Sequence, residues 1–138
     1  MSALQTEFTC EFSAEHTATP SVDAVISAVR AALAERGIPV FAHFDHAANA
    51  TAAGLALPPT QVLVFGAPAV GTLLMQAFPS MALELPLRMA CWQAADGTVK
   101  LAVPDMAAIA ARHGAQDHPV IAKMQQLLTA LAQSAGGR

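Results

Sequence analysis

The chain has 138 residues, of which 54% are hydrophobic and only 12% are charged, and its formal net charge is −3. This length is typical of one domain, which we place at 1–138, and it suffices for a single core without disulfides or a structural metal. The seven Lys and Arg residues are scattered singly and the chain has one Trp and no Tyr, which argues against a nucleic-acid-binding surface.

Hydrophobic periodicity predicts five strands and five helices. Alternating or wholly apolar runs predict strands at 7–13, 38–44, 61–65, 85–93 and 98–103. Apolar residues at helical spacing predict helices at 22–36, 46–53, 73–78, 105–113 and from 117–119 onward. The simplest packing of this order is an α+β two-layer sandwich, in which a mainly antiparallel five-stranded sheet carries two long helices on one face.

Capping and turn residues mark the ends of these elements. Ser21 and Asp45 are expected to be the N-caps of the helices that follow them, and Gly37 is expected to end the first helix. Thr72 is expected to cap the helix at 73–78. The final residues, 136–138, are expected to form a frayed tail.

Several runs in the chain are similar to those of a known family. They are FAHFDHAA at 41–48, GLALPPT at 54–60, VFGAPAVGTLLMQ at 64–76 and LPLR at 85–88, with Asp96, Gly97 and Leu101 further on. By these runs the chain resembles the bacterial and archaeal family called domain of unknown function 302, from the first helix to the last. The resemblance implies a β-α-β4-α core and a homodimer, and it implies no reaction, because the family has no established activity. The chain departs from the family at Ala67, where Asn usually precedes the Pro, and at 101–104.

The segment from Gly66 to Gly71, followed by Thr72, has the spacing of a phosphate-binding loop. Such a loop needs a Lys between the second Gly and the Ser or Thr, and this chain has none there. We therefore interpret the segment as a strand-to-helix turn. Gly66, Gly71 and Thr72 remain candidate ligand-binding residues, because a helix N-terminus can hold an anion.

A metal site is a further hypothesis for the histidines. His43, Asp45 and His46 lie close together in sequence, but zinc needs three or four converging ligands. A further ligand would have to come from His113 or His118 by a tertiary contact. We expect Asp45 to be a helix cap instead, and we predict no metal.

An enzyme is the alternative from a different functional class. Asp45 and His46 could act as acid and base with Arg88 as an anion anchor, or His46 could act with Glu84. The first version requires Asp45, His46 and Arg88 to converge in one pocket. Arg88 is otherwise expected on the sheet surface or at an interface. Cys91 is a poor nucleophile candidate, because Arg88 lies on the opposite face of the same strand.

Apolar composition, cysteine content and the first residues indicate the environment in which we expect the chain to occur. No Asp, Glu, Lys or Arg occurs between Ala47 and Leu83, but prolines divide this stretch, so we expect a subunit interface and no membrane span. Cys10 and Cys91 are expected to be buried free thiols in a reducing compartment. MSALQTEFTCEF at the N-terminus has no signal-peptide pattern, so we expect a cytoplasmic protein.

These observations favour a homodimeric domain that binds a small ligand or a partner protein. Charged residues are about half as frequent as usual, so apolar surface needs a partner. The candidate ligand-binding residues are Asp45, His46, Gly66, Gly71, Thr72 and Arg88. The methionines, including Met75 and Met124, are expected to fill the core or to line an adaptable apolar pocket. The sequence leaves any cofactor unknown and catalysis open.

Overall fold

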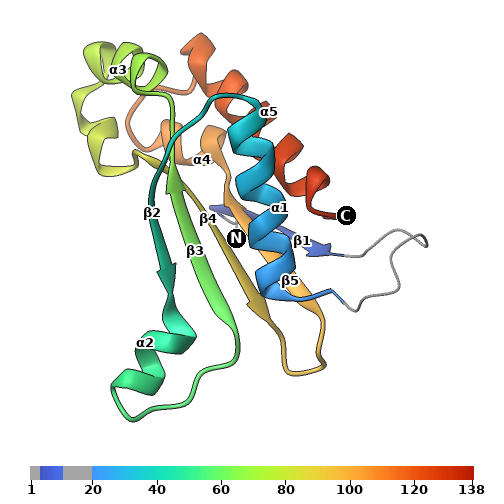
Figure 1. The fold of residues 1–138 in the computed structure, drawn as a ribbon. Helices are drawn as coiled ribbons and strands as arrows, with labels where there is room; N and C mark the ends of the chain where they lie inside the picture. Colours follow the sequence, from blue (N-terminus) through green and yellow to red (C-terminus); the bar gives the residue numbers. More distant parts are fainter. Residues whose placement is uncertain (1–3, 11–19) are drawn as a thin grey trace.

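The computed structural model describes residues 4–10 and 20–138. These residues form an α+β fold with a 3₁₀ helix, η1, beside its α-helices (Figure 1). The elements in chain order are β1 (Gln5–Cys10), α1 (Val22–Glu35), β2 (Val40–Asp45), α2 (His46–Ala52), β3 (Thr60–Phe65), α3 (Pro68–Ala77), η1 (Pro79–Leu83), β4 (Leu87–Gln93), β5 (Val99–Pro104), α4 (Met106–Ala111) and α5 (Pro119–Ser134). The predicted fold class is confirmed. The part of the first predicted strand beyond Cys10 lies outside the described residues.

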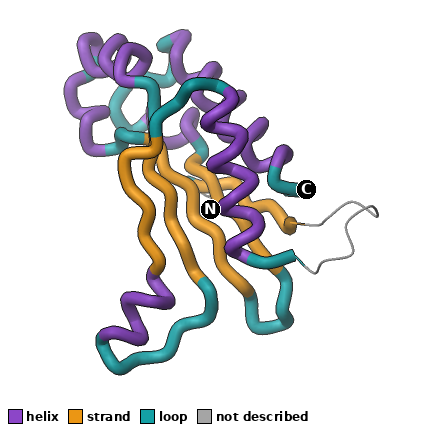
Figure 2. Tube along the Cα trace, viewed as in Figure 1, coloured by secondary structure: helices purple, strands orange, loops and turns teal. Residues whose placement is uncertain are grey.

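The five strands form one sheet in the order β1-β5-β4-β3-β2, and every neighbouring pair is antiparallel (Figure 2). Strands β2 to β5 follow one another as a meander, and β1 adds to the free edge of β5. The alternation predicted for β4 is confirmed, because Leu87, Met89 and Cys91 are buried while Arg88 and Ala90 are more exposed. The two faces of the sheet therefore differ in composition.

The inner face of the sheet, on which α1 and α5 pack, forms the core (Figure 1). Its apolar strand residues on β3, β4 and β5 are almost completely buried; they include Leu63, Phe65, Met89, Cys91, Leu101 and Val103. The outer face includes the alternate residues Phe44, Val62, Val64, Arg88, Ala90, Trp92, Lys100 and Ala102. No helix within 20–138 packs over the outer face as α1 and α5 do over the inner one, and most of its side chains stay partly exposed.

The helix caps agree with the sequence at two positions and differ at a third. Ser21 Oγ accepts a hydrogen bond from Ala24 N at 3.0 Å, and Asp45 Oδ1 accepts one from Ala48 N at 2.9 Å. The prediction that Thr72 caps a helix at 73–78 is wrong, because α3 already begins at Pro68. Proline is well suited to this first position, since its missing N–H would have no helical partner there. Thr72 therefore lies inside the helix.

The prediction of a frayed C-terminal tail is also wrong. Thr9 and Arg138 exchange two backbone hydrogen bonds of 3.0 Å, and Cys10 forms a bridge with Gly137. A Cβ at Gly137 would lie 2.7 Å from the backbone oxygen of Ala132, so only glycine fits there. The tail thus joins the edge strand β1.

The helix α2 extends beyond the end of the sheet (Figure 1). None of its residues is buried. The loop that follows exposes Leu55 by 70% and Leu57 by 44%. This projecting arm, α2 with the loop that follows it, therefore exposes apolar side chains.

Candidate functional site

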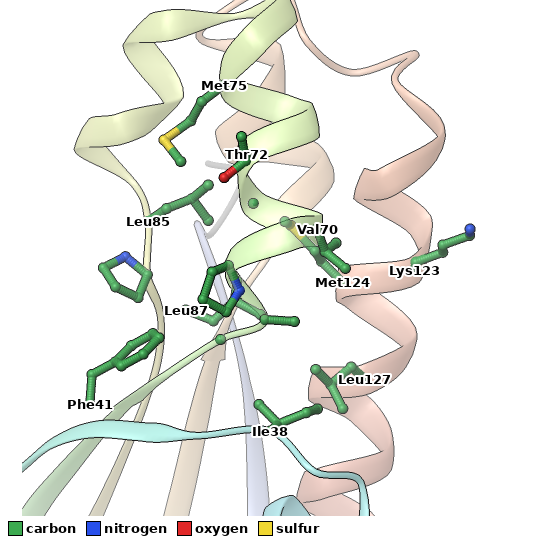
Figure 3. A pocket seen from close by; sticks show the side chains of 15 residues that line it. Ile38, Phe41, Val70, Thr72, Met75, Leu85, Leu87, Lys123, Met124 and Leu127 are labelled. Atoms are coloured by element: carbon green, nitrogen blue, oxygen red, sulfur yellow. The ribbon is translucent and has the colours of Figure 1, made fainter.

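A cavity of about 400 Å³ lies beside α3, and we call it the α3 pocket (Figure 3). Residues of α3 and α5 line it together with residues near the adjoining ends of β2, β3 and β4. The lining residues are Ile38, Phe41, Gly66, Ala67, Pro68, Val70, Gly71, Thr72, Met75, Leu85, Pro86, Leu87, Lys123, Met124 and Leu127. The volume is in the range that holds small organic molecules, about 300–1,000 Å³.

Small residues at the start of α3 contribute to this space. Gly66 and Ala67 lead from β3 into the helix, and Gly71 lies one turn further on. A Cβ at Gly71 would lie 3.6 Å from Leu85 Cδ1 and 3.9 Å from Met75 Cε. A larger side chain at Gly71 would therefore extend toward two residues that line the cavity.

The α3 pocket is almost entirely apolar. Among the lining residues that the structure describes, only Thr72 and Lys123 have polar side chains. Figure 3 shows Lys123 extending away from the cluster formed by Val70, Met124 and Leu127. Because few polar groups line the cavity, it suits a ligand with an apolar body and few hydrogen-bonding groups.

Three of the six candidate ligand-binding residues line the pocket, namely Gly66, Gly71 and Thr72. The other three lie elsewhere. Asp45 pairs with Gln61 and caps α2, whereas Arg88 pairs with Val64 and is on the outer face. Their partners on β3 are three positions apart, which corresponds to roughly 10 Å along the strand, and Asp45 and Arg88 lie on strands either side of β3.

The structure therefore does not bring Asp45 and Arg88 together. Because their side chains leave opposite faces of the sheet, no single ligand can contact both in a pocket. His46 stacks against Phe44 at a ring-centroid distance of 6.3 Å. The hypothesis of an acid–base site built from Asp45, His46 and Arg88 is therefore abandoned. The pairing of His46 with Glu84 is abandoned as well, because Glu84 contacts His113.

His43 belongs to a hydrogen-bonded network between the sheet and α1. Its Nε2 lies 2.6 Å from Gln61 Oε1, and Gln61 Nε2 donates to Asp23 Oδ1 at 2.6 Å. Arg30 Nη1 lies 3.5 Å from His43 Nδ1. Because an amide oxygen only accepts hydrogen bonds, His43 donates from Nε2, which leaves Nδ1 to accept from Arg30. This network satisfies Gln61, which is buried.

The four histidines that the structure describes do not converge on a metal site. His113 contacts Ser80 and Glu84, and His118 Nδ1 accepts from Val120 N at 3.2 Å at the start of α5. Across residues 4–10 and 20–138, no group of three or more His, Cys, Asp or Glu side chains could hold a metal ion. The metal hypothesis for His43, His46 and His113 thus finds no support in this part of the chain.

Both cysteines are buried free thiols, as the sequence predicts. Strand β5 lies between their strands β1 and β4, so their backbones are roughly 10 Å apart, too far for a disulfide. Burial raises the pKa of Cys10, and burial together with the proximity of Cys10 raises the pKa of Cys91 to about 12. Neither thiol is suited to nucleophilic chemistry.

The sequence pattern missed the part of the pocket that comes from α5. Met124 and Leu127 lie on a stripe with ordinary core spacing, and Lys123 is an exposed residue beside Met124. Only the tertiary packing of α5 near α3 shows that this stripe borders an open space. Met75 and Met124 do line an apolar pocket, which was one of the two roles expected for the methionines.

Comparison with known proteins finds relatives that match two thirds of the chain. The chain is 44% identical over 93 residues to proteins called fluoride-specific ion channel FluC 1 from Brucella suis and Brucella abortus, a stretch that covers 67% of this chain and 37% and 34% of those proteins. The chain thus spans about a third of the length of these relatives. No helix that the structure describes is long and apolar enough to cross a membrane.

A solved structure agrees with the fold over nearly the whole chain. The crystal structure of the uncharacterized conserved protein DUF302 from Bacillus stearothermophilus matches with a TM-score of 0.81 and 14% identity, covering 97% of this chain and 99% of that one. The model of the family described as domain of unknown function DUF302 matches residues 14–131. The chain therefore belongs to the DUF302 family.

Proposed function

We propose that this chain is a cytoplasmic, homodimeric domain that binds a small apolar molecule in the α3 pocket. The observation that carries the proposal is a cavity of about 400 Å³ with two polar side chains among its lining residues. An unfilled apolar cavity is unfavourable, because its lining atoms lose dispersion contacts. A ligand with an apolar body would restore these contacts and remove further apolar surface from water.

A fluorescent apolar dye tests the pocket. Anilinonaphthalene sulfonate is expected to bind the folded protein saturably and to be displaced by decanol. Gly71→Leu is expected to reduce binding at least tenfold, because the new side chain extends toward Leu85 and Met75 and fills the cavity. Ala69→Leu is the matched control, since Ala69 is an exposed residue of α3 that does not line the pocket. Equal dye binding by both variants and the original protein would refute the proposed site.

The outer face of the sheet is the surface that we assign to the homodimer. Phe44, Val62, Ala90 and Ala102 form an apolar row across four strands, and Trp92 lies next to it. Phe44 is 46% exposed and lies directly before α2, so the row continues into the projecting arm. Glu7 and Lys100 lie at one side of the face and Arg88 lies within it, so two related copies have charges of both signs to pair. A second copy would cover the apolar side chains that no helix of 20–138 covers.

Light scattering on a sizing column tests the dimer. The protein is expected to elute as a dimer at micromolar concentration, and Ala90→Glu is expected to convert it into a monomer. Ser27→Glu is the control, because Ser27 is exposed on α1. Trp92, the single Trp, provides a second measurement on the unchanged protein, since its emission should shift to longer wavelength on dilution. A monomer with concentration-independent emission would refute this assignment.

An accessory role beside a membrane protein is a second candidate, supported by the names of the Brucella relatives. In those proteins the matching stretch is about a third of a longer chain, as expected of a module attached to another part. The α3 pocket itself is unsuited to fluoride, because a small, strongly hydrated anion needs several donors in place of water. Millimolar fluoride should therefore shift no pocket resonance in an NMR titration beyond the effect of chloride. Saturable, fluoride-specific shifts at the pocket would instead favour direct fluoride binding.

A further inference from the structure

Ser80, His113 and Glu84 form a continuous line of hydrogen bonds, which we call the Ser80 cluster. Ser80 Oγ lies 2.7 Å from His113 Nδ1, and His113 Nε2 lies 3.1 Å from Glu84 Oε1. The side chains of His113 and Glu84 are only 10% and 14% exposed, whereas Ser80 is exposed. The cluster is separate from the α3 pocket, because none of its residues lines that cavity.

The partners of His113 determine which of its nitrogens carries the proton. An ionised carboxylate only accepts hydrogen bonds, so Glu84 holds the imidazole with its proton on Nε2. The lone pair of Nδ1 then faces Ser80 Oγ and can accept the hydroxyl proton. This is the arrangement of roles found in serine hydrolases, in which a carboxylate orients the histidine and the histidine acts as base for the serine. Here Nδ1 takes the part that Nε2 plays in those enzymes.

The fold holds the three residues from two separate elements. Ser80 is in η1 and Glu84 is its C-cap, so both come from one short segment after Pro79. His113 follows Arg112, the C-cap of α4, and its backbone N donates to Ala110 O at 2.9 Å. The structure thus aligns an acceptor, a base and an exposed hydroxyl.

We propose that Ser80 is an activated nucleophile for esters with an apolar acyl group. In the acylation step, Ser80 Oγ forms a bond to the carbonyl carbon while its proton moves to His113 Nδ1. The bond from that carbon to the alcohol oxygen breaks, and the alcohol leaves with the proton from His113. Water then attacks the acyl-serine by the same route, which releases the acid and restores Ser80.

The neighbourhood of Ser80 supports an apolar acyl group. Leu83 is 76% exposed, the highest value among the exposed large hydrophobic residues of the described chain. Residues three positions apart lie above one another in a 3₁₀ helix, so Leu83 is on the same side of η1 as Ser80. An acyl chain attached at Ser80 could therefore cover Leu83 and shield it from water.

A fluorophosphonate probe tests the nucleophile directly. The serine oxygen forms a bond to phosphorus and fluoride leaves, so the product is identified by intact mass and by peptide mapping. One label per chain is expected at Ser80, and none in Ser80→Ala. His113→Gln is expected to slow labelling by about 10²–10⁴-fold, the usual contribution of a general base. Ser134 is an internal control, because its Oγ donates to Leu131 O at 2.6 Å and has no histidine partner.

Two further measurements keep the test decisive. Nitrogen NMR of the unchanged protein should show His113 protonated at Nε2, and protonation at Nδ1 would overturn the proposal even if a variant fails to fold. A hexanoyl ester should be hydrolysed several-fold faster than an acetyl ester, and Leu83→Ser should remove this preference. Labelling of Ser80 no faster than of Ser134, or labelling unaffected by His113→Gln, would also overturn it. Dye binding in the α3 pocket is independent of all these results.

Discussion

Substitution of glycine by alanine is expected to have opposite effects at Gly71 and Gly37. Gly71 lies inside α3 and has no positive φ. A Cβ there makes ordinary contacts, 3.6 Å to Leu85 and 3.9 Å to Met75. In a helix interior alanine is more favourable than glycine by about 0.5–1 kcal/mol. We therefore expect Gly71→Ala to raise the free energy of unfolding by this amount.

Gly37 follows the end of α1 with a φ of +66°. No atom lies within 4 Å of an added Cβ, so crowding plays no part. The cost of Gly37→Ala therefore comes from the backbone alone. A residue with a Cβ is disfavoured in the left-handed region by about 1–2 kcal/mol. Part of this cost is offset because alanine lowers the conformational entropy of the unfolded chain relative to glycine. We expect a net loss of about 1 kcal/mol.

Thermal unfolding followed by circular dichroism measures both changes. For a domain of this size about 1 kcal/mol corresponds to roughly 4 °C. The Tm of Gly71→Ala should therefore rise by roughly 2–4 °C, and that of Gly37→Ala should fall by roughly 4 °C. A lower Tm for Gly71→Ala would contradict the start of α3 at Pro68, because glycine would then occupy a turn. A shift of the same sign in both variants would contradict the backbone argument as a whole.

Three further predictions concern the thiols, the β4–β5 turn and the start of α3. Burial raises the pKa of Cys91 to about 12 and also raises that of Cys10. Neither thiol should therefore react quickly with a disulfide reagent at neutral pH until denaturant is added. Fast reaction of the folded protein would contradict their burial. Hydrogen bonds from the side chain and backbone of Thr98 lower the pKa of Asp96 below 3.8. The ionised carboxylate therefore stabilises the turn above pH 3.8. This stabilisation is lost as the pH falls through the lowered pKa. NMR titration should show Asp96 protonating below pH 3.8, and Asp96→Asn should lack this step. Ala67→Asn should add a side-chain cap to α3 and stabilise the protein by about 1 kcal/mol in urea unfolding, whereas Ala67→Val should not.

Local patterns predicted most of the fold because the relevant signals were local. The alternation in β4 requires one buried face, and Ser21 and Asp45 provide side-chain oxygens where helices begin. The predicted start of α3 was wrong, because Thr72 can cap a helix but this helix already begins at Pro68. Prediction was wrong again at Gly137, where the bridge with β1 depends on a strand at the other end of the chain.

The candidate sites were less predictable because they depend on long-range contacts. Gly66 and Gly71 were identified by a loop spacing, although the pocket that they line is apolar and resembles no phosphate site. Arg88 and Asp45 were grouped by residue type, and the register of the sheet separates them. Ser80 and His113 lie in different elements, so no sequence spacing could have joined them.

The position of β1 at the sheet edge affects the order in which the protein can fold during synthesis. Cys10 pairs with Val99, which is translated 89 residues later. At about 5–20 residues per second, the ribosome leaves β1 without its partner strand for roughly 5–20 s. The bridge to Gly137 forms later still, whereas β2 to β5 can assemble as they emerge. The nascent chain therefore carries β1 unpaired while the residues between Cys10 and Val99 are translated, and chaperones that bind extended segments would have this strand as a binding site.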